Sequence, residues 1–151
     1  MPNQVGISEP CHSEKINTGG VIDRIDVIGS SVRIVDYKTG SVNSEIDSLQ
    51  SLFEYDSDKR NDAIFQLLMY CEIYSRISKA EKAVPSLYAL RNLNEKGFSD
   101  RLKIMQGSRE GTFIEDYSTI RHEFSQGLES VLASVFDNDL MVGSIIQVVN
   151  C

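Results

Sequence analysis

The sequence predicts an α/β or α+β fold in which helices pack on a central mixed β-sheet. Three observations predict it. Two short apolar strands joined by a tight turn come first, a long helix that is apolar on most sides follows, and another apolar strand comes after that helix. A helix that is apolar on most sides is buried, and we expect it to pack against the sheet. The length of 151 residues suits a single domain with its own core.

Composition and charge exclude several classes of protein. Apolar residues make up 41% and charged residues 25%, as in an ordinary globular domain. No apolar run approaches the ~20 residues of a membrane span, and no signal peptide is visible, so we expect no membrane association. Three widely spaced cysteines argue against a disulfide scaffold and indicate a reducing, cytoplasmic compartment. The net charge of -7 argues against nonspecific nucleic-acid binding by the whole surface, but it does not exclude a local basic groove.

The first segment, Met1 to Thr18, is polar and has few apolar side chains. We expect one short strand near Val5 to Ile7 and interpret the segment as a chain start cut from something longer. Glu9 and Glu14 lie just ahead of the first predicted hairpin, where they either add a carboxylate to it or are solvated charges. The end of the chain at Cys151, with no tail after it, also looks like truncation, so we expect residues 1–151 to be a fragment.

The predicted hairpin carries the most informative residues of the chain. Its strands are Val21 to Ile28 and Val32 to Lys38, and Gly29-Ser30 forms the turn, with glycine at positive φ. With this turn, residues whose numbers sum to 59 lie opposite each other. Asp23 then faces Asp36 on a side of the hairpin that is otherwise made of valine and isoleucine.

Two carboxylates on an apolar face need an explanation. Like charges opposite each other destabilise a sheet, and burying them costs more. A shared proton, a basic partner or a divalent cation would relieve the repulsion. Lys38 lies two residues after Asp36 on the same face, which fits a site for a charged substrate. The alternative is that both aspartates lie on a solvated face and that Lys38 is a surface charge.

The strongest predicted helix runs from Asn61 to Ser78, with Asn61 or Asp62 as its cap. Gln66 and Tyr70 are four residues apart and therefore share a face. Polar groups on a buried helix need partners. These two side chains therefore either point into the carboxylate site or make ordinary hydrogen bonds in the core.

The remaining elements are weaker. Ser41 to Lys59 is polar and acidic, and we expect a surface excursion beside the site. Val84 to Leu90 is typical of a strand, and a further strand is expected around Leu102 to Met105. Tyr117 to Phe136 is typical of an amphipathic helix. His122 falls off its apolar stripe, so we do not assign it as a catalytic base.

Residues 91–111 are polar and punctuated by glycine. Basic and aromatic side chains are interleaved in and just after this stretch: Lys96, Phe98, Arg101, Lys103, Arg109 and Phe113. Such a composition either contacts a nucleic-acid backbone or belongs to a solvated loop.

The chain contains no Gly-rich phosphate loop, no His-Glu-x-x-His, no Cys-x-x-Cys and no Gly-x-Ser-x-Gly. Three stretches, in this order, resemble the RecB-like branch of the PD-(D/E)XK nuclease superfamily, which includes nuclease domains of bacterial helicase–nuclease recombination enzymes. They are Gly20-Val-Ile-Asp-Arg-Ile-Asp26, Asp36-Tyr-Lys-Thr-Gly40 and Gln66-Leu-Leu-Met-Tyr70. The joint match is specific, whereas Asp-x-Lys alone would not be.

The resemblance implies a restriction-endonuclease-like core and a divalent metal, Mg²⁺ or Mn²⁺. It implies that the catalytic residues are Asp23, Asp36 and Lys38. The implied metal ligands are Asp23, Asp36 and the backbone carbonyl of Tyr37. Gln66 and Tyr70 match the helix motif that lines the DNA site. Phosphodiester hydrolysis needs a nucleophilic water and relief of charge at phosphorus, both of which a metal held by carboxylates provides. Lys38 could orient the water, deprotonate it or stabilise the developing charge.

Two departures from the family pattern stand out. No helix with a metal-binding His precedes the hairpin. Many members also hold an iron–sulfur cluster, which normally needs four cysteines. Cys151 falls where the first of the late cysteines would be, so such a cluster is expected only in a full-length parent.

The sequence therefore predicts a metal-dependent DNA exonuclease domain of DNA repair or recombination. Its expected partners are DNA and a helicase region or subunit of the parent protein. The alternative is a noncatalytic DNA-binding or scaffolding domain with the same fold.

Overall fold

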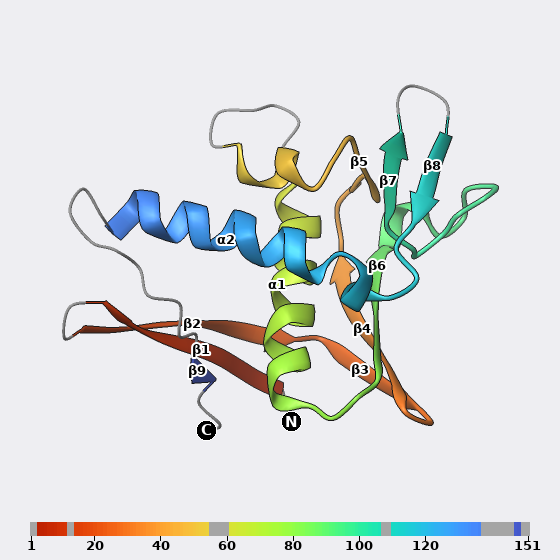
Figure 1. Cartoon of the computed structure of the whole chain (residues 1–151). Coiled ribbons are helices and arrows are strands. Elements are labelled where there is room, and N and C mark those ends of the chain that lie inside the picture. Colours follow the sequence, from red (N-terminus) through yellow and green to blue (C-terminus); the bar gives the residue numbers. More distant parts are fainter. Residues whose placement is uncertain (1–2, 12–13, 55–60, 107–109, 137–146, 149–151) are drawn as a thin grey trace.

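Three small sheets and two α-helices make up the described part of the chain in the computed structural model (Figure 1). Residues 3–11, 14–54, 61–106, 110–136 and 147–148 are described. Strand orders are β2-β1-β9, β3-β4-β6 and β5-β7-β8. The architecture is α+β, as the sequence predicts.

The central sheet holds the predicted hairpin. Its strands are β3 (Arg24–Ile28), β4 (Ser31–Lys38) and β6 (Lys82–Ala89). β3 and β4 are antiparallel, and β4 and β6 are parallel, so the sheet is mixed. One face of β4 and β6 is buried against α1 (Asp62–Ile77), the helix that connects these two strands. Figure 1 shows α1 beside this sheet. In this view α2 crosses α1, and the β1–β2 hairpin passes the lower part of α1.

Helix α1 forms as predicted. The side chain of Asn61 caps it by accepting a hydrogen bond from the backbone N–H of Ile64 at 3.1 Å. Its apolar stripe is buried in the core: Ile64, Leu67, Leu68 and Cys71. The periodicity of apolar residues thus fixes which side of α1 meets the sheet.

The turn of the β3–β4 hairpin yields the first testable prediction. Gly29 has φ of 62°, and a Cβ added there would meet no atom within 4 Å. Gly29→Ala should therefore lower the free energy of unfolding by about 1–2 kcal/mol through backbone strain alone. Gly40→Ala is the matched control, because Gly40 has equal space and no positive φ. Denaturant unfolding measures both, and equal stability of the two variants would contradict the turn geometry.

The first eighteen residues contain the predicted strand near Val5 to Ile7, but far more strand than the sequence predicts. Instead of one short strand, β1 (Asn3–Cys11) and β2 (Glu14–Ile22) form a long antiparallel hairpin, with β9 (Gln147–Val148) on its outer edge. The segment has too few apolar residues for a period-of-two signal. Backbone pairing along the whole hairpin supplies the order that the sequence pattern does not indicate.

The first strand of the predicted catalytic hairpin is also shorter than expected. Val21 to Ile28 is interrupted at Asp23, where the chain leaves the ladder of β2 and enters that of β3. The predicted register holds for every pair from Arg24↔Val35 to Ile28↔Ser31. Pairing ends at Arg24↔Val35, so Asp23 and Asp36 are not a ladder pair. The face is less buried than its apolar side chains predict, since Val21 is 43% and Val27 is 70% exposed.

The remaining elements complete the three sheets and cover the core. Strands β5 (Glu45–Ile46), β7 (Lys103–Gln106) and β8 (Glu110–Phe113) form the third sheet. Single turns of 3-10 helix are η1 (Gln50–Phe53), η2 (Leu90–Asn92) and η3 (Tyr117–Thr119). Helix α2 (Arg121–Phe136) follows η3, so the predicted second helix begins with a 3-10 turn. Within the described residues, no helix is both long and apolar enough to cross a membrane.

A buried carboxylate joins α1 to η3 and α2. Glu72 is fully buried and accepts hydrogen bonds at Oε2 from the Tyr117 hydroxyl at 2.8 Å and from Arg121 Nε at 2.9 Å. Arg76, one turn further along α1, pairs with Oε1. Burial by itself would raise the pKa of Glu72, but the donors and the two arginines outweigh it and lower that pKa. The ionised network therefore stabilises this packing.

Candidate functional site

The five side chains of the predicted catalytic and DNA-binding motifs come together at the end of β4, beside α1. Asp23 lies at the start of β3, and Asp36 and Lys38 lie at the end of β4. Gln66 and Tyr70 project from α1, which packs on this face of the sheet. The fold thus converts three separate motifs into one cluster.

Asp36 and Lys38 form the centre of the cluster. Asp36 is 3% exposed, and Lys38 Nζ lies 2.8 Å from its Oδ2. The contact is an ion pair without hydrogen-bond geometry, so Oδ2 is buried with no hydrogen-bond partner. Burial raises the pKa of Asp36 and the charge of Asp23 raises it further, although Lys38 opposes both. Asp36 is therefore a carboxylate whose negative charge lacks full compensation.

Asp23 reaches the cluster by another route than the predicted cross-strand pairing. Its Oδ2 accepts a hydrogen bond from the backbone N–H of Tyr37 at 2.8 Å. This bond connects the bend between β2 and β3 to the end of β4. Asp23 is exposed, in contrast to buried Asp36, so the two carboxylates differ in environment although their charges interact.

Gln66 and Tyr70 hold Lys38. Lys38 Nζ donates to Gln66 Oε1 at 2.6 Å, and Gln66 Nε2 donates to the Tyr70 hydroxyl at 2.8 Å. Of the two alternatives for these side chains, the geometry matches contact with the carboxylate site. The amide of Gln66 spans the gap, because its oxygen faces Lys38 while its nitrogen faces Tyr70.

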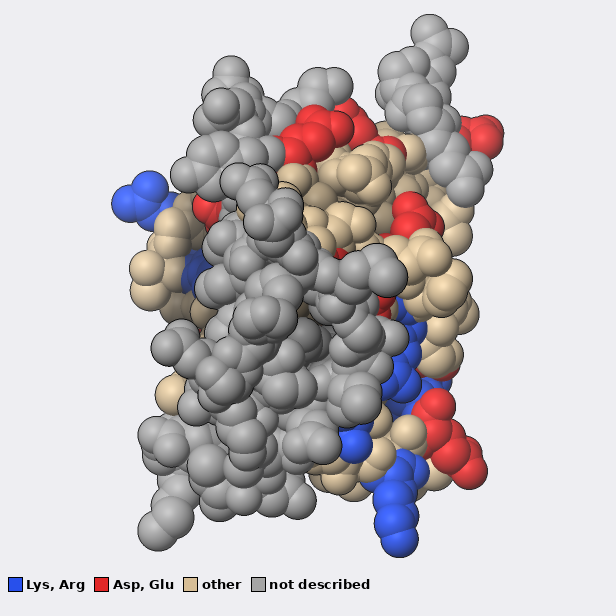
Figure 2. Space-filling model, turned by 60° about the vertical axis from the view of Figure 1, so that its left-hand side comes forward, with Lys and Arg blue, Asp and Glu red and all other residues tan. Residues whose placement is uncertain are grey.

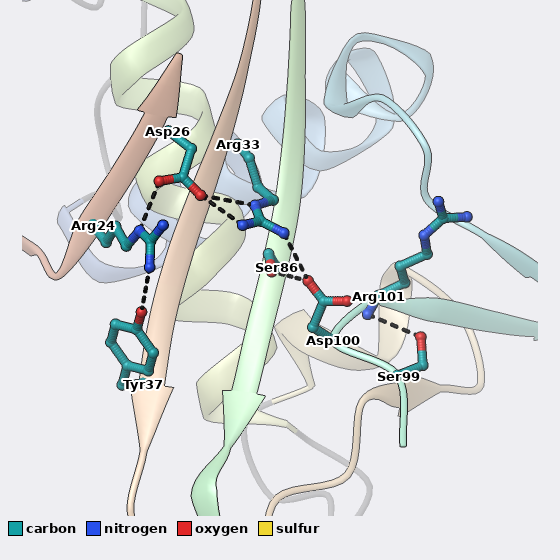
Figure 3. Close-up of polar contacts among 8 residues, drawn as sticks. All are labelled: Arg24, Asp26, Arg33, Tyr37, Ser86, Ser99, Asp100 and Arg101. Carbon is teal, nitrogen blue, oxygen red and sulfur yellow. Dashed lines mark hydrogen bonds and ion pairs between the residues drawn. The ribbon is translucent and has the colours of Figure 1, made fainter. Parts of the chain in front are cut away.

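The opposite face of the same sheet carries a second polar network, drawn in Figure 3. Asp26 accepts from Arg24 Nε and from Arg33 Nη2, each at 2.6 Å, and these contacts lower the pKa of Asp26, with Arg33 the larger cause. Arg24 also reaches the Tyr37 hydroxyl at 3.4 Å, and Arg33 lies 3.7 Å from Asp100. The network ties β3 to β4 and anchors the ring of Tyr37, whose N–H binds Asp23.

Sequence reasoning missed this second network, although the signal was present. The register that sums to 59 places Asp26 opposite Arg33, and that pair is found in the ladder. Opposite charges facing each other across the ladder are the signal that indicates this pair.

The predicted basic stretch does not gather at the cluster. Arg101 pairs with Glu115, and Lys103 lies 3.6 Å from Glu45 and over the ring of Phe113. These partners favour a structural role for the two cations. Arg109 lies outside the described residues, and so does Cys151, the candidate ligand of an iron–sulfur cluster.

The buried Oδ2 of Asp36 provides a test of whether a cation fits here. This oxygen is in an ion pair with Lys38 but accepts no hydrogen bond, and a carboxylate oxygen near a second carboxylate has the chemistry that Mg²⁺ and Mn²⁺ prefer. Within the described residues there is no group of three or more His, Cys, Asp or Glu that could hold a metal. The acidic donors that the described residues offer at this place are the carboxylates of Asp36 and Asp23, whose charges interact.

Metal binding at this place should stabilise the fold. At ten times the dissociation constant, Mg²⁺ or Mn²⁺ should add about 1.4 kcal/mol to the free energy of unfolding, and Asp36→Asn should remove this gain. Glu110→Gln is the control, since Glu110 is an exposed acid on β8. Thermal unfolding with and without metal measures the effect. An equal shift in Asp36→Asn would place the metal elsewhere.

Comparison with known proteins identifies a family. The family model described as PD-(D/E)XK nuclease superfamily matches residues 4–141, which is most of the chain. The α+β architecture with a mixed sheet is consistent with the restriction-endonuclease-like fold of that family. No curated protein and no solved structure matches the chain.

Proposed function

The chain belongs to the PD-(D/E)XK nuclease superfamily, and on this premise we propose that it is a divalent-metal-dependent deoxyribonuclease. Members of the superfamily are generally nucleases that act on DNA and use divalent metals. The observation that carries the proposal is one connected chain of contacts, Asp36–Lys38–Gln66–Tyr70, with Asp23 beside it. Two aspartates and the ammonium of Lys38 at the end of a strand suit the hydrolysis of a phosphodiester.

The chemistry assigns different tasks to these residues. In hydrolysis a water oxygen bonds to phosphorus, the bond to the leaving sugar oxygen breaks, and a proton ends on that oxygen. Asp23, Asp36 and the carbonyl of Tyr37 would hold the cation. When bound, the cation supplies the positive charge that acidifies a water and neutralises phosphoryl oxygens.

Lys38 has the contacts of a hydrogen-bond donor. It donates to Gln66 and pairs with Asp36, so its ammonium is held in place before substrate arrives. A fixed positive donor supports a role in orienting the attacking water or stabilising charge that develops on the phosphoryl group. Removal of a proton from water by Lys38 has less support, because that role needs the neutral amine.

DNA must approach through a restricted part of the surface. The net charge is -7, which disfavours binding over the whole molecule. Figure 2 shows acidic side chains near the top of the face in view, and basic and acidic side chains side by side at its lower right.

A noncatalytic DNA-binding role is the second candidate. Two observations favour it: Lys38 Nζ already contacts Asp36 Oδ2, and the described residues hold no metal site of three acidic, histidine or cysteine ligands. In this alternative the ion pair replaces the cation and the fold serves as a scaffold.

The motifs support a finer assignment to the RecB-like exonuclease branch, acting in cytoplasmic DNA repair or recombination beside a helicase region. The test is digestion of end-labelled linear duplex and of closed circular DNA with Mg²⁺. We expect the linear DNA to be degraded and the circle to persist. Cutting of the circle would contradict the exonuclease assignment. Binding of DNA without cleavage of either substrate would favour the noncatalytic candidate.

A further inference from the structure

Strand β2 passes so close to Tyr70 that only glycine fits at the crossing. A Cβ added at Gly20 would lie 2.7 Å from the Tyr70 hydroxyl oxygen, 2.9 Å from Cε1 and 3.2 Å from Cζ. Contacts below 3.0 Å are too short for a Cβ. Gly20 has no positive φ, so its backbone does not require glycine. The close approach to Tyr70 is therefore the reason for glycine at this position.

We propose that Gly20 is a positioning residue for Lys38, acting through Tyr70 and Gln66. The contacts run without a break from the backbone of β2 to the centre of the cluster. Gly20 abuts the Tyr70 hydroxyl, that hydroxyl accepts from Gln66 Nε2, and Gln66 Oε1 accepts from Lys38. The role in catalysis rests on the proposed function, whereas the contacts do not.

Burial makes the Tyr70 end of these contacts stiff. Tyr70 is 6% exposed and belongs to the hydrophobic core, so its ring cannot yield freely to a methyl group at position 20. Any displacement of the ring moves the hydroxyl that orients the Gln66 amide. An amide without that acceptor can rotate, and its oxygen then no longer faces Lys38.

The inference gives a physical reason for a spacing in the sequence. Gly20 lies near the end of β2, and Asp23, three residues later, forms the break between β2 and β3. Asp23 binds the backbone of Tyr37, and Gly20 supports Tyr70. One short stretch thus fixes both flanks of the site.

The experiment compares Gly20→Ala, Tyr70→Phe and the double variant. The NMR signal of the Gln66 side-chain amide, read without metal or DNA, should shift in Gly20→Ala and in Tyr70→Phe. For a cleaving enzyme, kcat should fall about 10- to 100-fold in Gly20→Ala, since small displacements of a positioned group have effects of this size. In the Tyr70→Phe background, Gly20→Ala should add no further loss of kcat, because the hydroxyl through which it acts is gone.

Gly111→Ala is the matched control. Gly111 is also a strand glycine, and a Cβ there would lie 2.6–2.9 Å from atoms of Lys103 and Met105, outside the site. It should leave the Gln66 signal and kcat unchanged.

A lower melting temperature of Gly20→Ala with an unchanged Gln66 signal would overturn the proposal, whether or not the protein cleaves DNA. A shifted signal in a protein that never cleaves DNA would uphold the contacts and refute the proposed function instead. If Gly20→Ala does not fold, rescue of folding by Tyr70→Leu supports the contact, and failure of that rescue overturns it.

Discussion

Replacing Asp36 by Asn should abolish DNA cleavage while leaving the metal-free fold intact. Asp36 is the buried acid of the cluster and the proposed metal ligand, so we expect cleavage to fall by about 100-fold or more. Stability should not fall with it. Because burial raises the pKa of Asp36 in the folded state, its ionised form disfavours folding at any pH above that pKa, and a neutral amide removes this cost.

The two readouts separate a functional acid from a structural one. Cleavage of linear DNA in Mg²⁺ and thermal unfolding without metal are measured on the same samples. Lys38 loses its counter-ion in the variant. Its side chain is 27% exposed and is hydrogen-bonded to Gln66, so we expect this loss to leave the fold stable. Wild-type cleavage by Asp36→Asn would refute the assignment of Asp36. Unfolding of the variant would show that the carboxylate is structural.

Replacing Glu72 by Ala should have the opposite profile, with a large loss of stability. The substitution leaves Arg76, Arg121 and the Tyr117 hydroxyl without their shared acceptor. Removal of one partner from a buried charged network costs about 3–5 kcal/mol, and we expect the free energy of unfolding to fall by that amount. Denaturant unfolding at neutral pH measures it.

Glu72→Gln serves as the control that keeps the shape and one acceptor for Tyr117. It should cost less, about 1–3 kcal/mol. The pKa of Glu72 is lowered by folding, so its contribution is present above the unfolded pKa of about 4.3 and is lost as pH falls through the folded value. The difference between wild type and Glu72→Gln should therefore shrink in acid. A difference that is the same at pH 7 and in acid would contradict the ionised network.

The elements with strong patterns could be predicted from the sequence. Strand β4, helix α1 and strand β6 have apolar residues at the spacing of their own secondary structure, and the asparagine cap and the turn glycine add local signals. Burial of these residues in one core then follows. This packing brings the motifs on β4 and α1 together, which is why Lys38 contacts Gln66.

Other features depend on contacts that no local pattern encodes. The interruption at Asp23 arises because the chain exchanges one ladder partner for another, and period-of-two alternation continues across such a break. The β1–β2 hairpin is held by backbone pairing between polar segments. Gly20 meets Tyr70 only after β2 and α1 have packed.

The most direct test of the central claim is the cleavage of linear DNA by the wild-type protein as Mg²⁺ is titrated from zero, with Lys38→Ala measured alongside. The site predicts no hydrolysis in chelator, hydrolysis that rises to a plateau with metal, and a plateau at least about 100-fold lower in Lys38→Ala. Hydrolysis that persists in chelator, or an equal plateau in the two proteins, would contradict it.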